Sequence, residues 1–318
     1  MMRIVVVGAG GVGGLLAGLL ARAGVQVGVV ARGAHLEAIR SEGIAVESPL
    51  GTFTARVAAE PAPGALGPAD AVLVAVKSWQ VPEVAPSLTP LLAGGGVAVP
   101  LQNGVEAAGQ LAQVLGPERV AGGTIAVLAW IAGAGRVQHV GSTPRLALGE
   151  RGDLARAPSP RLEALAAALR AAGAEAAVTP DIEAAVWEKF LFVEPLGAIG
   201  AVSRAPIGVV RSVPETRQLL ALAQEEVAAL ARARGVALPP DAAARALARV
   251  DTVQADGTIS MQRDLGAGRA SELADQTGAV VRLARAAGVA APVHETLLAA
   301  LLPQELAARG RIEPFART

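Results

Sequence analysis

The chain has 318 residues, of which 52% are hydrophobic and 18% are charged, and its 28 acidic residues balance its 28 basic ones. This length allows two domains that each bury a core, and the scattered basic residues exclude the footprint of a nucleic-acid-binding protein. Charges or glycine-rich turns interrupt every apolar run before about 18 residues, which excludes a membrane span. We expect a soluble, cytoplasmic protein.

The absence of cysteine excludes a disulfide framework, a cysteine-ligated zinc and a thiol nucleophile. The absence of tyrosine excludes the Tyr-x-x-x-Lys pair on which short-chain dehydrogenases depend. Three histidines, His35, His139 and His294, are too far apart in the sequence to indicate a metal site, and we expect no metal. We interpret all three as structural residues.

Short β-branched runs alternate with helical periods in the first half of the chain. The strands expected there cover residues 3–7, 25–30, 69–76, 97–101, 136–139 and 145–148. Alternation of this kind is typical of parallel β-α-β units, in which ligands bind outside the carboxyl ends of the strands.

From Asp181 onward the apolar residues recur with a helical period, and proline and glycine mark the breaks. The sequence therefore predicts an α/β protein with two domains. Residues 1–180 are expected to form a Rossmann-type, doubly wound and mostly parallel sheet, and residues 181–318 an all-helical domain.

A glycine-rich turn, Gly8-x-Gly10-x-x-Gly13, follows the first expected strand and opens the first expected helix. The first glycine permits the tight turn, the second lets a pyrophosphate approach the backbone, and the third lets the helix pack on the strand. The pyrophosphate then lies at a helix N-terminus, where free N–H groups point at it. Because a second strand follows within about 30 residues, the pattern predicts a dinucleotide site. Its residues are Gly8, Ala9, Gly10, Gly11, Val12 and Gly13.

The residue at the end of the second expected strand discriminates between the two nicotinamide cofactors. An acidic residue there would hold the ribose hydroxyls of NAD, whereas this chain has Arg32, which suits a 2′-phosphate. Arg32 therefore favours NADP(H) and a role of residues 1–180 in binding it. The alternative is that Arg32 is one of many surface arginines.

Only two of the 28 basic residues are lysines, Lys77 and Lys189. A guanidinium stays protonated at any working pH, whereas an ammonium can release its proton and has a pKa that burial readily lowers. Lys77 follows the third expected strand, and Lys189 lies between Trp187 and Phe190 in an apolar setting. The alternative to a role in proton transfer is that either lysine is an ordinary solvated surface residue.

Five segments, in order along the chain, resemble the family of 2-dehydropantoate 2-reductase, also called ketopantoate reductase. They are the glycine loop, Ala75–Gln80, Gln102-Asn103-Gly104, Trp187-Glu188-Lys189 and Ser260-Met261-x-x-Asp264-x-x-x-Gly268-Arg269-x-x-Glu272. The resemblance spans almost the whole chain. It implies a Rossmann domain joined to a helical substrate and catalytic domain, and an enzyme that uses NADPH to reduce ketopantoate to pantoate on the route to pantothenate and coenzyme A.

The resemblance also implies a role for each matching residue. Arg32 and Lys77 would bind the phosphate end of NADPH together with the glycine loop. Asn103 would lie between the nicotinamide and the substrate, where it contacts both. Lys189 would bind the substrate and donate the proton. Taken alone, Asn103 is also compatible with a turn before Gly104.

From the helical domain, the resemblance implies two further contacts. Ser260 would bind the substrate, and Glu272 would contact both substrate and cofactor and orient the catalytic ammonium of Lys189. Without the family pattern, Ser260 would be interpreted as a helix cap and Glu272 as a solvated acid.

The sequence departs from the family pattern beside Lys189. Well-studied members carry asparagines four and eight residues after this lysine, where they bind substrate, but here Val193 and Gly197 occupy those positions. Since residues four apart share a helical face, we expect a more apolar and roomier pocket, unless Pro195 resets the helix. Glu194, next to that proline, has no role in the pattern.

The expected chemistry is hydride transfer from C4 of NADPH to the carbonyl carbon of a small 2-oxo acid, with Lys189 protonating the oxygen. Two alternatives stay open: a reductase of a different 2-oxo acid on the same scaffold, and a non-catalytic module that senses NADPH. The helical half is apolar enough to form a homodimer, although the sequence does not demonstrate one.

Overall fold

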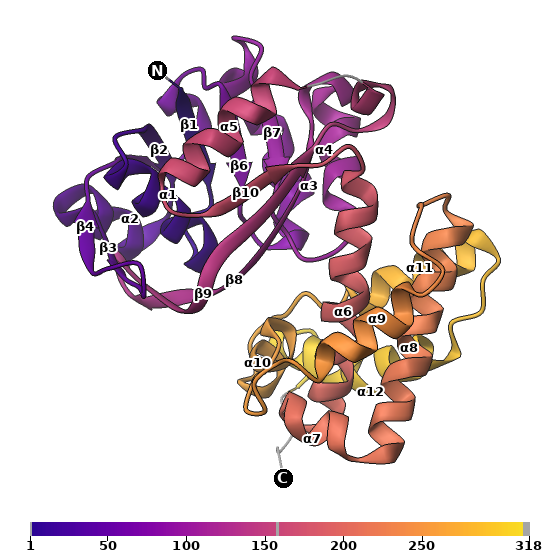
Figure 1. The fold of residues 1–318 in the computed structure, drawn as a ribbon. Coiled ribbons are helices and arrows are strands. Elements are labelled where there is room, and N and C mark those ends of the chain that lie inside the picture. The colour runs from indigo at the N-terminus through magenta and orange to yellow at the C-terminus, as the bar shows by residue number, and fades with distance from the viewer. Residues whose placement is uncertain (1, 157–158, 314–318) are drawn as a thin grey trace. The chain divides into compact units, whose positions relative to one another are not determined.

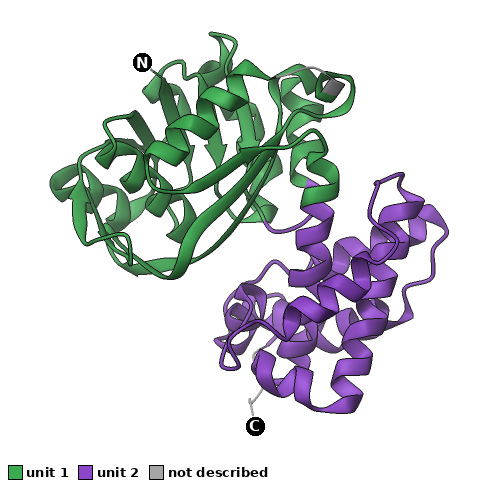
Figure 2. Ribbon diagram, in the orientation of Figure 1, with its two compact units in different colours: residues 1–102, 107–185 green, residues 103–106, 186–318 purple. Residues whose placement is uncertain are grey.

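The computed structural model describes residues 2–156 and 159–313. The chain separates into two compact units (Figure 2): one comprises residues 1–102 and 107–185, and the other residues 103–106 and 186–318. We call them the sheet unit and the helical unit and describe each by itself.

A five-stranded parallel sheet forms the centre of the sheet unit (Figure 1). Its strands, in spatial order, are β5 (Ala58–Glu60), β2 (Gln26–Val30), β1 (Arg3–Val7), β6 (Ala71–Val74) and β7 (Val97–Pro100). The chain starts at the central strand and builds outward to both sides, which is the doubly wound order of dinucleotide-binding folds. The predicted parallel sheet is confirmed.

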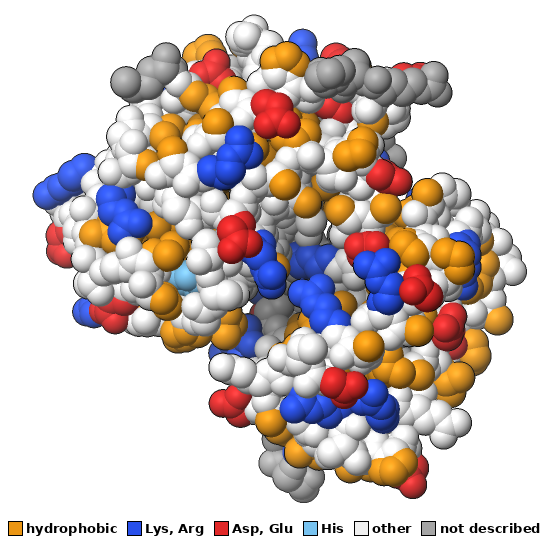
Figure 3. All heavy atoms as spheres, viewed as in Figure 1, with side chains coloured by type: hydrophobic (Ala, Val, Ile, Leu, Met, Phe, Trp, Pro, Cys, Tyr) orange, Lys and Arg blue, Asp and Glu red, His pale blue; other side chains and the backbone are white. Residues whose placement is uncertain are grey.

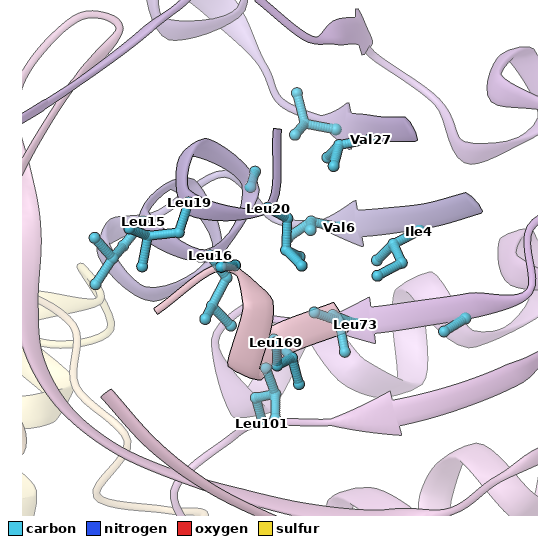
Figure 4. Close-up of a cluster of buried hydrophobic side chains, with 14 of the residues drawn as sticks. Ile4, Val6, Leu15, Leu16, Leu19, Leu20, Val27, Leu73, Leu101 and Leu169 are labelled. Carbon is cyan, nitrogen blue, oxygen red and sulfur yellow. The ribbon is translucent and has the colours of Figure 1, made fainter. Parts of the chain in front are cut away.

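Strands β1, β2, β6 and β7 are buried on both faces, which explains their β-branched and nearly continuous apolar sequences. Ile4 and Val6 of β1 belong to the core that contains helix α1 (Gly11–Arg22), whereas Val5 and Val7 belong to a second core on the opposite face. Figure 4 shows Ile4 and Val6 beside the leucines of α1. The alternation follows from the two-residue period of a strand.

A second, mixed sheet completes the sheet unit. Its strands are β3 (Ile44–Glu47), β4 (Phe53–Ala55), β8 (Gly122–Gly133), β9 (Arg136–Gly149) and β10 (Glu175–Val178). The two strands expected at 136–139 and 145–148 are parts of the single long strand β9, which pairs antiparallel with β8. The sequence did not predict β8, because its run of glycine, alanine and aliphatic residues lacks the alternation that marks a half-buried strand.

The remaining helices of the sheet unit cover its sheets or connect their strands. They are α2 (Gly33–Glu42), α3 (Val81–Val84), α4 (Ala107–Leu115) and α5 (Pro160–Ala171), with short 3₁₀ turns at Pro63–Leu66, Ser78–Gln80, Ala85–Leu92, Pro117–Arg119 and Gly152–Arg156.

Helices build the second unit, as the sequence predicted. They are α6 (Ile182–Ser203), α7 (Ile207–Ser212), α8 (Pro214–Ala233), α9 (Ala242–Val250), α10 (Ser260–Gly266), α11 (Thr277–Ala287) and α12 (Pro292–Ala308). The first residues of α6 belong to the sheet unit and the rest to the helical unit. Pro195 lies inside α6 and does not end it. Among the helices that the structure describes, none is both long enough and apolar enough to cross a membrane.

Candidate active site

The glycine loop connects β1 to α1 and has the shape that a bound pyrophosphate requires. Gly8 has a φ of +99°, and a Cβ there would lie 2.8 Å from the backbone nitrogen of Val76. A Cβ at Gly13 would overlap the carbonyl oxygen of Gly8. Gly10 differs, since a Cβ there would meet no atom within 4 Å. The open space therefore lies at the glycine that a pyrophosphate approaches.

The N-terminus of α1 is also suited to an anion. Gly10 precedes the helix in an extended conformation, no side chain among the described residues caps it, and the first turn contains no acidic residue. The first N–H groups of a helix have no partner within the helix, and the helix dipole favours negative charge there. The residues of this loop fit the diphosphate of a dinucleotide.

His35 links the glycine loop to the turn between β8 and β9. The backbone N–H of Gly135 donates to Nδ1 of His35 at 3.0 Å, so the ring proton is on Nε2, which donates to the carbonyl oxygen of Ala9 at 2.8 Å. The imidazole thus fixes the peptide between two loop glycines. The interpretation of His35 as structural agrees with this geometry, but its contact with the loop had no signal in the sequence.

Arg32 and Lys77 follow the two strands that flank β1. Arg32 immediately precedes α2 in an extended conformation, and its Nη2 lies 3.8 Å from Oε1 of Glu83 in a largely exposed pair. Lys77 precedes the turn Ser78–Gln80, with its Nζ 5.8 Å from the ring centroid of Trp79. Since β2 and β6 both run parallel to β1, both residues lie at the edge of the sheet that carries the glycine loop.

The four candidate residues of the helical unit form two pairs. Nδ2 of Asn103 donates to Oγ of Ser260 at 3.4 Å, although 157 positions separate the two residues. Lys189, half-buried on α6, interacts electrostatically with Glu272, whose buried carboxylate accepts a hydrogen bond from Nε2 of Gln276 at 3.3 Å. Ser260 is the first residue of α10, but the structure gives it no capping bond.

The pKa of the Lys189 ammonium is lowered to about 8. Burial is the main cause, because it disfavours the charged form; the carboxylate of Glu272 opposes it, and the guanidinium of Arg249 adds to it. An amine with a pKa near neutrality can act as a proton donor or acceptor at physiological pH.

The helix face beyond Lys189 is apolar, as expected, but the expected extra room at Gly197 is absent. A Cβ at Gly197 would lie 3.1 Å from Cγ2 of Ile259 and 3.3 Å from Cε of Met261. These two side chains occupy the space that an asparagine at this position would need. The prediction of a roomier pocket is therefore wrong at Gly197, because the segment around Ser260 packs directly against α6.

Glu194 points into the core of the helical unit and pairs with a histidine. His294 is fully buried, with its Nε2 2.7 Å from Oε2 of Glu194 and its Nδ1 2.6 Å from Oε2 of Glu226. Burial disfavours the imidazolium, but the two carboxylates outweigh this effect and raise the pKa of His294 to about 9. Glu194, which the sequence left unexplained, is a buried partner of His294.

The fold and the glycine loop together define a Rossmann-type protein that binds a dinucleotide. Residues 4–153 match the family model of ketopantoate reductase PanE/ApbA, and residues 181–305 match the model of its C-terminal part. The chain belongs to the ketopantoate reductase family and is an oxidoreductase acting on CH–OH groups.

Relatives and solved structures agree with this assignment. The chain is 32% identical to the 2-dehydropantoate 2-reductase of Halobacterium salinarum, over 93% of this chain and 96% of that protein. A crystal structure of a PanE/ApbA family ketopantoate reductase from Ralstonia eutropha is 31% identical with a TM-score of 0.87, covering 97% of this chain and 100% of that one. D-mandelate dehydrogenase, solved with NADH and anilino(oxo)acetate, has a TM-score of 0.86 at 19% identity, over 97% of this chain and 99% of that chain; it shares the fold.

Proposed function

We propose that this protein uses NADPH to reduce 2-dehydropantoate (ketopantoate) to pantoate, on the route to pantothenate and coenzyme A. The observation that carries the proposal is the half-buried amine of Lys189, whose pKa is lowered to about 8 and which interacts with the carboxylate of Glu272. A positioned amine of this kind can donate a proton to a carbonyl oxygen near neutral pH.

Each half of the chain has its own task in this proposal. The glycine loop holds the diphosphate at the N-terminus of α1, and Arg32 and Lys77 hold the phosphate end of the cofactor. When bound, the cofactor supplies the hydride for the carbonyl carbon. In the helical unit, Asn103 and Ser260 hold the substrate.

Lys189 completes the reduction in two ways. Its positive charge stabilises the negative charge that grows on the carbonyl oxygen, and its proton then converts that oxygen to the hydroxyl. Glu272 favours the charged form of Lys189 against the effect of burial, so the amine is still mostly protonated at neutral pH.

A different small 2-oxo acid is the second candidate substrate. The apolar face formed by Val193, Gly197, Ile259 and Met261 favours it, because this face lacks the amides that bind ketopantoate in well-studied family members. NADPH oxidation measured with ketopantoate and with its less branched analogues tests both candidates. Turnover of ketopantoate at the highest kcat/KM supports the proposal, and preference for another acid supports the alternative. Stabilisation by NADPH without oxidation by any of these acids would instead indicate a sensing module.

Replacing Arg32 with alanine is expected to weaken NADPH much more than NADH. Loss of charge-assisted hydrogen bonds to a 2′-phosphate costs about 1.5–3 kcal/mol, or roughly 10- to 100-fold in affinity, whereas NADH lacks this phosphate. Calorimetric titration with both cofactors measures the effect. Glu83→Gln is the matched control, since it removes the acid near Arg32 and should preserve or improve NADPH binding. Equal losses for both cofactors in Arg32→Ala would place the 2′-phosphate elsewhere.

Three further expectations from the sequence stay predictions. They are a cytoplasmic location, a homodimer formed through the helical unit, and a domain boundary after residue 180.

A further inference from the structure

A second cation lies in the neighbourhood of Lys189. Exposed basic side chains are common on the helical unit (Figure 3), so exposure alone singles out none of them. Arg249, on α9, is distinguished by its neighbours. Its Cζ lies 4.5 Å from the ring centroid of Phe192, and Phe192 lies three residues after Lys189 on the same face of α6.

Charged side chains nearby act on the ammonium of Lys189. The guanidinium of Arg249 and the ammonium of Lys189 repel each other, and the carboxylate of Glu272 attracts the ammonium. Arg249 is thus close enough to Lys189 for its charge to lower the pKa of the ammonium. A substrate anion bound beside both cations would reduce this repulsion.

A 2-oxo acid brings this anion next to its carbonyl group. In the proposed function Lys189 donates its proton to the carbonyl oxygen of the substrate. Val193 and Gly197 have no polar side-chain group that could bind the substrate carboxylate. A planar guanidinium matches a carboxylate with two parallel hydrogen bonds, and stacking on an aromatic ring holds that plane in place. Phe192 is almost fully buried, so the surrounding side chains hold its ring in one position under the guanidinium of Arg249.

We propose that Arg249, supported by the ring of Phe192, binds the carboxylate of the 2-oxo acid substrate, an inference that rests on the proposed function. Val193 and Gly197 on α6 make no polar contact with the substrate. In this proposal Arg249 on α9 supplies a polar contact in their place. Specificity for an acid over a neutral carbonyl compound follows from this single charge.

Arg249→Met tests the proposal, because methionine keeps an unbranched apolar stem over Phe192 and removes the charge. With saturating NADPH, we expect KM for the preferred 2-oxo acid to rise roughly 10- to 100-fold, as for the loss of a hydrogen-bonded charge. KM for the corresponding neutral 2-oxo amide should change little, so the preference for acid over amide should collapse. Arg249→Lys should retain part of the preference.

The pH profile is a second readout that a packing role alone would not move. Since Arg249 lowers the pKa of Lys189, its removal should shift the alkaline decline of kcat to higher pH. Arg245→Met, at an exposed arginine one turn earlier on the same helix, is the matched control and should leave KM, the acid preference and the profile unchanged.

Calorimetric titration with oxamate, a 2-oxo acid analogue that cannot be reduced, separates this proposal from the proposed function. Oxamate binding to the wild-type protein and its loss in Arg249→Met would support the role of Arg249, even if no 2-oxo acid were reduced and the proposed function failed. Equal binding to both proteins, absence of binding to the wild type, or an unchanged acid preference in Arg249→Met would overturn it.

Discussion

Lys189→Ala is expected to lower kcat for the reduction by about two orders of magnitude or more, because the reaction loses its proton donor and the charge that stabilises the developing alkoxide. NADPH affinity should stay near that of the wild type, since the glycine loop and Arg32 belong to the sheet unit. Steady-state turnover together with cofactor titration measures both quantities.

The pKa of Lys189 sets the pH dependence of the same reaction. Reduction needs the protonated amine, so kcat should be level below a pH of about 8 and fall above it. Oxidation of the alcohol needs the neutral amine, so its rate should rise through the same pH range.

Two variants separate the functions of the Lys189 amine. Lys189→Arg keeps the charge but cannot release a proton at working pH, so it should stay impaired and lose the alkaline decline. Glu188→Ala, at the exposed neighbour on α6, is the control for disturbance of the helix. Wild-type turnover in Lys189→Ala would remove this residue from the mechanism.

Removal of His294 should destabilise the protein more than any surface substitution. In His294→Ala the buried carboxylate of Glu194 and the partly exposed carboxylate of Glu226 lose the cation between them, and breaking a largely buried charge cluster in this way costs about 3–5 kcal/mol. Urea unfolding followed by far-ultraviolet circular dichroism reports mainly on the helices and measures the loss.

The pH dependence of this stabilisation has a definite sign. The pKa of His294 is about 9 in the folded protein and about 6.5 when unperturbed, so the folded state binds the proton more tightly. The contribution is therefore complete below a pH of about 6.5 and is lost as the pH rises through 9. His294→Ala should lack this dependence.

Glu295→Ala is the control for the His294 experiment. It removes the exposed neighbour of His294 on α12, whose pair with Arg285 at 3.3 Å is solvated and should contribute at most about 1 kcal/mol. If His294→Ala were no less stable than this control, the buried cluster would not contribute to stability as its geometry indicates.

The sequence by itself determined the features that are encoded in contiguous residues. The β1 run, the glycine loop and the start of α1 follow one another directly, and the helical half shows its period along each helix. Lys189 stood out because lysine is rare in this chain, whereas Arg249 did not, because arginine is common.

Only the tertiary structure decided which distant residues meet. His35 and Gly135, like Glu194 and His294, are 100 positions apart, and Asn103 and Ser260 are 157 positions apart. Backbone preferences and hydrophobic periods act over a few residues and are visible in the sequence. The partners of buried polar groups depend instead on how whole helices and strands pack, since any carboxylate that packing brings near His294 would satisfy the same chemistry.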